Sequence, residues 1–185
     1  METSQAIQAR RSIRLYQNKP VEEKKIYQLI NAARLAPSAK NRQPWRFIIE
    51  TDTVRKKQIS AIMRAFFKEG QDYPDYVKSI TLSARIIDRA PVVIWVLKER
   101  DDRWNTSDLL SIGAAIENMC LAAVDMGMGT VWLRDVCYTQ VELERFIGTQ
   151  LEIVSCIAVG YPAEQPDFRP RKTIEELVLE QLGAY

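Results

Sequence analysis

The chain has 185 residues, of which 46% are hydrophobic and 27% are charged, and it contains no histidine. The 26 Lys and Arg residues against 24 Asp and Glu residues give a formal net charge of +2. This composition is typical of a globular protein, and the length predicts one domain that spans residues 1–185. The missing imidazole excludes Ser-His-Asp and Cys-His catalysis and histidine-ligated zinc. The nearly balanced charge argues against a nucleic-acid partner.

Two further features concern location and metals. Residues 1–11 are polar and lack the apolar run of a signal peptide, and no stretch approaches the about 20 apolar residues of a membrane span. We therefore expect a cytoplasmic protein without a membrane partner. The three cysteines, Cys120, Cys137 and Cys156, are far apart, mainly flanked by apolar residues, and form no Cys-x-x-Cys motif. They indicate buried free thiols, and no metal site is expected.

The sequence predicts alternating helices and strands in the first half of the chain. A short helix precedes the first arginine cluster, and the apolar residues of 22–36 recur with the spacing of one helix face until Pro37. Bulky and β-branched residues predict a strand over 45–49. The helical spacing then returns after Asp52.

The middle of the chain contains its most apolar segments. The unbroken apolar run of 92–97 predicts a strand that is covered on both faces. Residues 107–126 have helical spacing and are apolar on nearly every side, which is typical of a buried helix. Small residues in this helix allow another helix to approach closely, so we expect it at the centre of the protein or at a subunit interface. Gly127 and Gly129 are expected to close it, and a strand follows over 130–133.

Two capping boxes mark helix starts in the last third of the chain. Thr139-x-x-Glu142 predicts a short helix that Gly148 ends, and residues 151–160 then form a further strand. Thr173-x-x-Glu176 predicts a last short helix. That helix carries the apolar residues Leu177, Val178 and Leu182. This mixture of elements indicates an α+β or α/β sandwich with one sheet.

Two basic clusters lie near opposite ends of the chain. The first, Arg10-Arg11-Ser12-Ile13-Arg14, places three guanidinium groups and a hydroxyl where they suit a phosphate. The second, Arg169-Pro170-Arg171-Lys172, lies in a proline-punctuated and therefore extended segment. Both clusters can serve one dianion if the chain ends meet. A solvated basic turn and an exposed connector are the alternative interpretations, and no glycine-rich nucleotide motif is present.

A polar loop, Ala36-Pro37-Ser38-Ala39-Lys40-Asn41-Arg42-Gln43-Pro44-Trp45, follows the first long helix. Its two prolines restrict its shape. Ser38, Asn41 and Gln43 offer hydrogen-bond donors and acceptors that suit the edge of a heterocycle. A plain turn is the alternative interpretation.

These three segments together resemble the nitroreductase family of FMN-dependent oxidoreductases. The resemblance extends to Ala90-Pro91 before the buried strand, to Gly127-Met128-Gly129-Thr130-Val131-Trp132, and to Gly160-Tyr161-Pro162 ahead of the second basic cluster. The motifs occur in family order over nearly the whole chain. The resemblance implies an α+β sandwich with one central, mostly antiparallel sheet flanked by helices. It also implies a homodimer with one FMN held noncovalently in each of two interface sites.

The family's FMN contacts carry over to particular residues of this chain. At the phosphate and ribityl chain, the resemblance places Arg10, Arg11 and Ser12, with Arg14 nearer the polar edge of the ring. Arg169 and Arg171 are expected to reach the same phosphate. The residues expected from the partner subunit are Pro37, Ser38 and Asn41, with Gln43 as a further candidate.

The resemblance also places Leu133, Arg134 and Asp135 beside the flavin ring, with a backbone N–H near its N5 atom. Asp135 departs from the common family pattern, because many relatives have glycine there. We expect the backbone contact to be kept and the added carboxylate to change the charge or the access.

The resemblance implies an enzyme in which no side chain is itself the catalytic residue, because the flavin carries the hydride chemistry. We expect a ping-pong cycle in which NADH or NADPH reduces FMN and a small-molecule acceptor, such as a nitroaromatic or a quinone, then takes its place. Two alternatives are a noncatalytic FMN-binding or regulatory protein, and a dehalogenase or dehydrogenase branch of the same family. The segment 68–88 either covers the flavin or packs as an ordinary helix. Its candidate cover residues are Tyr73, Tyr76 and Ile80.

Overall fold

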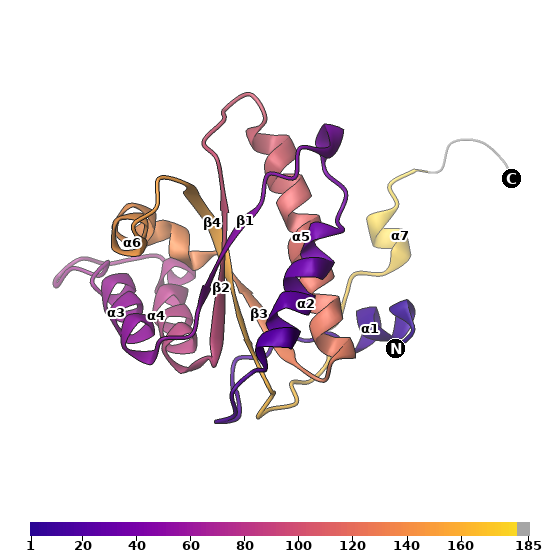
Figure 1. The fold of residues 1–185 in the computed structure, drawn as a ribbon, viewed down its shortest axis with the longest axis horizontal. Helices are drawn as coiled ribbons and strands as arrows, with labels where there is room; N and C mark the ends of the chain where they lie inside the picture. Colours follow the sequence, from indigo (N-terminus) through magenta and orange to yellow (C-terminus); the bar gives the residue numbers. More distant parts are fainter. Residues whose placement is uncertain (181–185) are drawn as a thin grey trace, which may run out of the picture.

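The computed structural model of the chain describes residues 1–180. Its elements form three layers, with one sheet between two layers of helices (Figure 1). Helices α3, α4 and α6 cover one face of the sheet, and α2 and α5 cover the other.

The sheet has four strands, β1 (Arg46–Glu50), β2 (Val92–Lys98), β3 (Gly129–Leu133) and β4 (Glu152–Gly160). Their order is β1-β2-β4-β3, and every neighbouring pair is antiparallel. The expectation of one antiparallel sheet is confirmed. Every residue of β2 is buried, because successive side chains enter the cores on opposite faces of the sheet. Strands β1 and β3 are the two edges.

The first helical layer consists of α2 (Glu23–Arg34) and α5 (Asn105–Asp125), with α1 (Thr3–Ala9) packed against α5. Leu29 and Ala33 of α2 are fully buried, as the apolar spacing predicts. Gly127 follows α5 with a φ of +70°, a left-handed conformation that suits glycine. Gly129 does not belong to this helix end, since it is the first residue of β3.

The second helical layer consists of α3 (Thr53–Arg64), α4 (Asp75–Arg89) and α6 (Gln140–Ile147). The side chain of Asp52 caps α3 by accepting hydrogen bonds from the Val54 and Arg55 N–H groups. Within the segment 68–88, Ile80 is fully buried, so it packs as an ordinary helix residue. Tyr76 is 70% exposed.

The shorter elements are η1 (Ala39–Asn41), η2 (Asp135–Thr139) and α7 (Ile174–Leu177). The capping box predicted at Thr139 is wrong, because η2 runs directly into α6 and the Thr139 side chain makes no cap hydrogen bond. Its hydroxyl is instead buried without a partner within residues 1–180. The capping box at Thr173 is confirmed, and α6 ends at Gly148 as predicted. Leu182 lies outside the described residues.

The expectation that no segment approaches the length and apolar character of a membrane span is wrong for α5. This helix is long and apolar enough to cross a membrane by length and composition alone. It nevertheless packs against α2, α1 and β3, and residues along its length are buried in the core. Its apolar character is therefore that of a core helix.

All three cysteines are free thiols. Cys120 and Cys156 are buried, as expected, but Cys137 is only partly buried because it lies in η2 at the surface. Burial raises the pKa of each thiol. No group of side chains that could hold a metal ion occurs in residues 1–180.

Candidate functional site

The two ends of the chain run side by side through backbone hydrogen bonds. The N–H of Gln17 donates to the carbonyl of Tyr161, and the N–H of Ala163 donates to the carbonyl of Leu15, each at 2.9 Å. Tyr16 and Pro162 form an isolated bridge between these bonds. This pairing brings the segments that carry the two basic clusters to one place.

Side chains reinforce the pairing. A carboxylate oxygen of Glu164 accepts hydrogen bonds from the N–H groups of Arg14 and Leu15. The Tyr16 hydroxyl donates to the carbonyl of Ile13 at 2.7 Å, and the carbonyl oxygen of Ala158 lies 3.1 Å from the same hydroxyl. Burial raises the pKa of Tyr16, so the hydroxyl remains a donor.

The N-terminal segment also docks on the start of edge strand β3. The N–H of Ile13 donates to the carbonyl of Thr130 at 2.9 Å, and Ser12 forms a bridge with Thr130. Gly129 makes this approach possible, since a Cβ atom at this position would lie 2.5 Å from Cγ1 of Ile13. The local sequence thus holds the first basic cluster against β3.

The residues of both basic clusters line one cavity of about 110 Å³. Every basic-cluster residue predicted for the site lies there, with three further residues from the segment 166–168. The cavity residues are Arg10, Arg11, Ser12, Arg14, Pro166, Asp167, Phe168, Arg169 and Arg171. The two ends of the chain therefore meet, which is the condition for both clusters to bind one ligand.

The charges in this arginine pocket are largely uncompensated. Arg10 pairs with Glu117 of α5 at 3.1 Å, while no other arginine of the pocket has a carboxylate within 4.0 Å among residues 1–180. The Phe168 ring lies 5.2 Å from the guanidinium carbon of Arg11 and 5.8 Å from that of Arg171. Asp167 is the single acidic residue in the lining. This excess of positive charge suits a dianion such as a phosphate monoester.

The residues predicted to lie beside the ring follow on the same edge strand. Leu133 is the buried last residue of β3, and Arg134 is exposed just beyond it. By the rise of a strand, Leu133 lies about 10 Å along β3 from Thr130, the residue that forms a bridge with Ser12 of the arginine pocket. The Asp135 carboxylate accepts a hydrogen bond from the hydroxyl of Ser83 in α4 at 2.7 Å. Asp135, the residue that departs from the common family pattern, is therefore in contact with the second helical layer.

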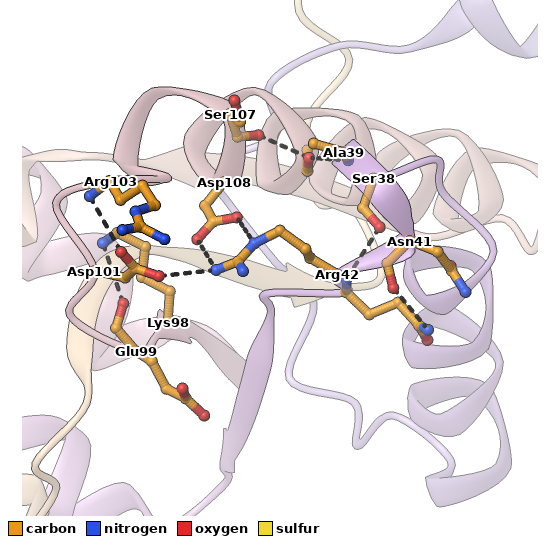
Figure 2. A network of polar contacts seen from close by, with 12 residues as sticks. Ser38, Ala39, Asn41, Arg42, Lys98, Glu99, Asp101, Arg103, Ser107 and Asp108 are labelled. Atoms are coloured by element: carbon orange, nitrogen blue, oxygen red, sulfur yellow. Dashed lines mark hydrogen bonds and ion pairs between the residues drawn. The ribbon is translucent and has the colours of Figure 1, made fainter.

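The polar loop containing Pro37, Ser38, Asn41 and Gln43 lies elsewhere on the chain. It contacts the N-terminal half of α5, where Arg42 reaches Asp108 (Figure 2). The N–H of Ala39 also donates to the hydroxyl of Ser111. The arginine pocket meets α5 through Glu117, on a different side of that helix. No residue of the loop lines the arginine pocket, so a single chain does not join the two parts of the predicted site.

Several apolar side chains of α5, β3 and α7 are exposed. Leu110 of α5 is 73% exposed and Trp132 of β3 is 44% exposed. Trp132 lies against Gly113 of α5, whose Cβ position is 3.7 Å from the indole ring. Ile174 and Leu177 of α7 are also exposed. These exposed apolar side chains are available for contact with another chain.

Sequence reasoning missed several residues of this region. Phe168 and Glu164 belong to no sequence motif, although an aromatic residue directly before Arg169 in an extended segment was a usable signal. A larger cavity of about 960 Å³ lies between residues 16–21, α2, α3 and the start of β2. None of the predicted site residues lines it.

Comparison with known proteins places these features in a family. The sequence model of the nitroreductase family matches residues 7–161. An Archaeoglobus fulgidus protein, provisionally named NADH dehydrogenase/NAD(P)H nitroreductase, is 34% identical over 88% of this chain and 86% of its own length. An iodotyrosine deiodinase of Thermotoga neapolitana is 28% identical over 89% of this chain and 91% of its own.

Solved structures agree with the sequence comparison. A provisionally named nitroreductase of Desulfovibrio desulfuricans, solved in complex with FMN, superposes with a TM-score of 0.79. It is 27% identical, and the match covers 98% of this chain and 97% of that one. Because the family match spans most of the sequence and the fold agrees throughout, the chain is a member of the nitroreductase family.

Proposed function

We propose that this protein is an FMN-dependent oxidoreductase of the cytoplasm that takes electrons from NADH or NADPH. The observation that carries the proposal is the meeting of both basic clusters in one pocket at the start of β3. The names of the relatives and the FMN complex of a structural neighbour support the same cofactor and donor.

The pocket residues fit the phosphate end of FMN. Arg10, Arg11, Arg169 and Arg171 present planar donor groups to the cavity, and Ser12 adds a hydroxyl. Most of these guanidinium groups have no carboxylate partner among residues 1–180, so an incoming phosphate does not have to displace one. These residues bind the cofactor in the proposal and do not touch the reacting atoms.

The end of β3 fits the ring of FMN. The ring lies beside Leu133 and Arg134 in the proposal, and the distance of about 10 Å along the strand from Thr130 leaves room for the ribityl chain. A backbone N–H at Arg134 then orients the ring. The Asp135 carboxylate is held by Ser83, so it is turned toward α4.

Bound flavin supplies hydride transfer, and this explains how a chain without histidine performs redox chemistry. Arg14 lines the arginine pocket, and the proposal places it nearer the polar edge of the ring than the other arginines, where a cation would favour negative charge on the ring. NAD(P)H donates and leaves, and an acceptor such as a nitroaromatic or a quinone then occupies the same position. In the proposal, the protein's residues position the donor or the acceptor against the flavin.

We further propose that two copies of the chain complete each site. Pro37, Ser38, Asn41 and Gln43 lie apart from the arginine pocket of their own chain, so they reach the flavin bound by the partner subunit. The exposed Leu110 and Trp132 side chains supply an apolar surface for such a dimer. The small residues of α5 allow the two helices to approach closely.

The redox proposal is tested with the purified protein under anaerobic conditions. It is expected to bind FMN, and NADH or NADPH should bleach the flavin absorbance. The reduced protein is then mixed with a nitroaromatic compound, a quinone or an iodinated phenol, and reoxidation is followed. Failure to bind added FMN contradicts the proposal. A bound flavin that stays oxidised indicates a noncatalytic binding protein, and selective reaction with the iodinated phenol indicates a dehalogenase.

The shared site is tested with mixed dimers. Arg10→Ala damages the phosphate pocket, and Asn41→Ala damages the polar loop, so each variant homodimer should bind FMN weakly at both sites. In a dimer of one Arg10→Ala chain and one Asn41→Ala chain, both lesions fall in one site and the other site is intact. Titration should therefore recover one tight FMN site per mixed dimer.

A loop that serves its own chain gives a different result. Every site of the mixed dimer then carries one lesion, and no tight site appears. Arg64→Ala is the control, because Arg64 is an exposed residue of α3 away from the pocket. It should bind FMN like the unmodified protein.

A further inference from the structure

The polar loop is held in a backbone conformation that its residues do not favour. Lys40, Asn41 and Gln43 have φ angles of +50°, +55° and +48°, and none of them is glycine. The left-handed region is unfavourable for an ordinary L-residue, although asparagine tolerates it better. Contacts elsewhere must therefore hold the loop in this shape.

Two of these contacts are modest hydrogen bonds. The N–H of Gln43 donates to the hydroxyl of Ser38 at 3.0 Å, and the N–H of Ala39 donates to the hydroxyl of Ser111 at 3.3 Å. A neutral hydrogen bond contributes only modestly to stability, because it replaces a hydrogen bond to water. These two hydrogen bonds do not by themselves offset the conformational strain of three left-handed residues.

The strongest contact is made by Arg42, which reaches from the loop to α5 (Figure 2). Its Nε and Nη2 atoms donate to the two carboxylate oxygens of Asp108 at 3.2 and 3.3 Å. Nη2 also donates to Asp101 at 3.1 Å. The guanidinium carbon lies 4.7 Å from the ring of Trp104. This forked and stacked arrangement needs arginine, because lysine has no planar fork.

The burial of Asp108 makes its ion pair with Arg42 important for the position of the loop. The Asp108 side chain is 3% exposed, whereas that of Arg42 is 31% exposed. A buried carboxylate that loses its partner is strongly destabilising, so Asp108 fixes where Arg42 lies. Asp108 also lies in the first turn of α5, where the helix dipole favours a negative charge.

We propose that Arg42 and Asp108 are positioning residues for the FMN site, which lock the loop so that Ser38 and Asn41 face the flavin. This inference rests on the proposed function. Arg42 and Asp108 do not touch the cofactor in it. They act through Asn41, which is the neighbour of Arg42 in the chain.

The test measures the FMN dissociation constant of the apoprotein by flavin fluorescence, together with thermal unfolding without FMN. Arg42→Ala should weaken FMN binding about tenfold, as expected when the contact of Asn41 with the flavin is lost. Arg42→Lys should recover only part of the loss. Asp108→Asn keeps the shape of the side chain and should weaken binding in the same direction.

Arg55→Ala is a matched control. Arg55 also pairs with a largely buried carboxylate, that of Glu50, at 2.7 Å, and its guanidinium carbon lies 5.0 Å from the ring of Phe146. This pair joins β1 to α3, away from the loop. Its loss should lower the unfolding temperature and leave FMN affinity unchanged.

Coupling between variants separates positioning from a general loss of stability. Once Arg42 is removed, the side chain of Asn41 no longer faces the flavin, so the Arg42→Ala/Asn41→Ala double variant should bind FMN no more weakly than Arg42→Ala alone. The effects of Arg42→Ala and Arg10→Ala should instead multiply, because Arg10 acts at the other end of the cofactor.

The outcomes are distinct. If Asn41→Ala weakens binding and Arg42→Ala does not, this inference is overturned and the proposed function stands. Multiplying effects of Arg42→Ala and Asn41→Ala also overturn it. If Asn41→Ala leaves FMN affinity unchanged, the loop has no part in the cofactor site, and both this inference and that part of the proposed function fail.

Discussion

The side chain of Glu164 accepts a hydrogen bond from the backbone N–H of Arg14, a residue 150 positions earlier in the chain. The same oxygen accepts from the N–H of Leu15. One carboxylate thus fastens the segment of the first basic cluster to the segment that leads into the second. The arginine pocket depends on this fastening, since its two halves come from opposite ends of the sequence.

Removing the Glu164 carboxylate should loosen the pocket. Glu164→Ala leaves two N–H groups without their acceptor and should lower the free energy of unfolding by about 1–3 kcal/mol, with weaker FMN binding. Glu164→Gln keeps an oxygen acceptor and should lose less of both. Urea unfolding and FMN titration measure these changes. Equal losses in the two variants would show that the hydrogen bonds do not matter.

Adding one methyl group at Gly129 should displace the N-terminal segment. Gly129→Ala places a Cβ within 3 Å of three atoms of Ile13, and overpacking of this kind costs about 1–3 kcal/mol. Because Ile13 lies between Ser12 and Arg14, FMN affinity should fall as well. Equilibrium unfolding and FMN titration provide the two readouts. The double variant Gly129→Ala/Ile13→Ala should recover part of the affinity, and a double variant no better than the single would argue against a clash.

The thiols should differ in reactivity toward iodoacetamide. Burial raises the pKa of Cys120 and Cys156 and keeps both away from the reagent. Cys137 is partly buried and donates to the carbonyl of Arg134, so it should react slowly at mildly alkaline pH. Mass spectrometry should find one label on the native protein and three after unfolding. Cys137→Ser should abolish the native label, and fast labelling at Cys156 would contradict the described core.

A buried lysine should make stability depend on alkaline pH. Lys56 is 3% exposed, and its ammonium group donates to the carbonyls of Ala90 and Pro91. Burial lowers the pKa of Lys56 below its usual value of 10.5, so the unfolded state binds this proton more tightly.

Stability should therefore rise as the pH increases from the folded-state pKa of Lys56 toward 10.5, where the cost of the buried charge disappears. The Lys56→Met variant lacks this group. The free energy of unfolding of the unmodified protein should increase relative to that of Lys56→Met over this range. Parallel pH profiles for the two proteins would show that the pKa of Lys56 is not depressed.

Much of the secondary structure could be predicted because its signals are local. The apolar spacing of 22–36 matches α2, and the unbroken run of 92–97 matches β2. The failure at Thr139 is equally instructive. Its motif is a valid helix start in isolation, but η2 is continuous with α6, and the Thr139 hydroxyl makes no cap hydrogen bond there.

Which residues suit a phosphate and which segments form helices and strands could be predicted from the amino-acid sequence, because donor chemistry and periodicity are properties of neighbouring residues. That both arginine clusters face one cavity became evident from the folded chain, since it follows from hydrogen bonds between residues 15–17 and 161–163. The same is true of the pairing of Arg42 with Asp108, which joins a strained loop to a distant helix. Contacts across long separations arise when packing closes the fold, and no local pattern encodes them.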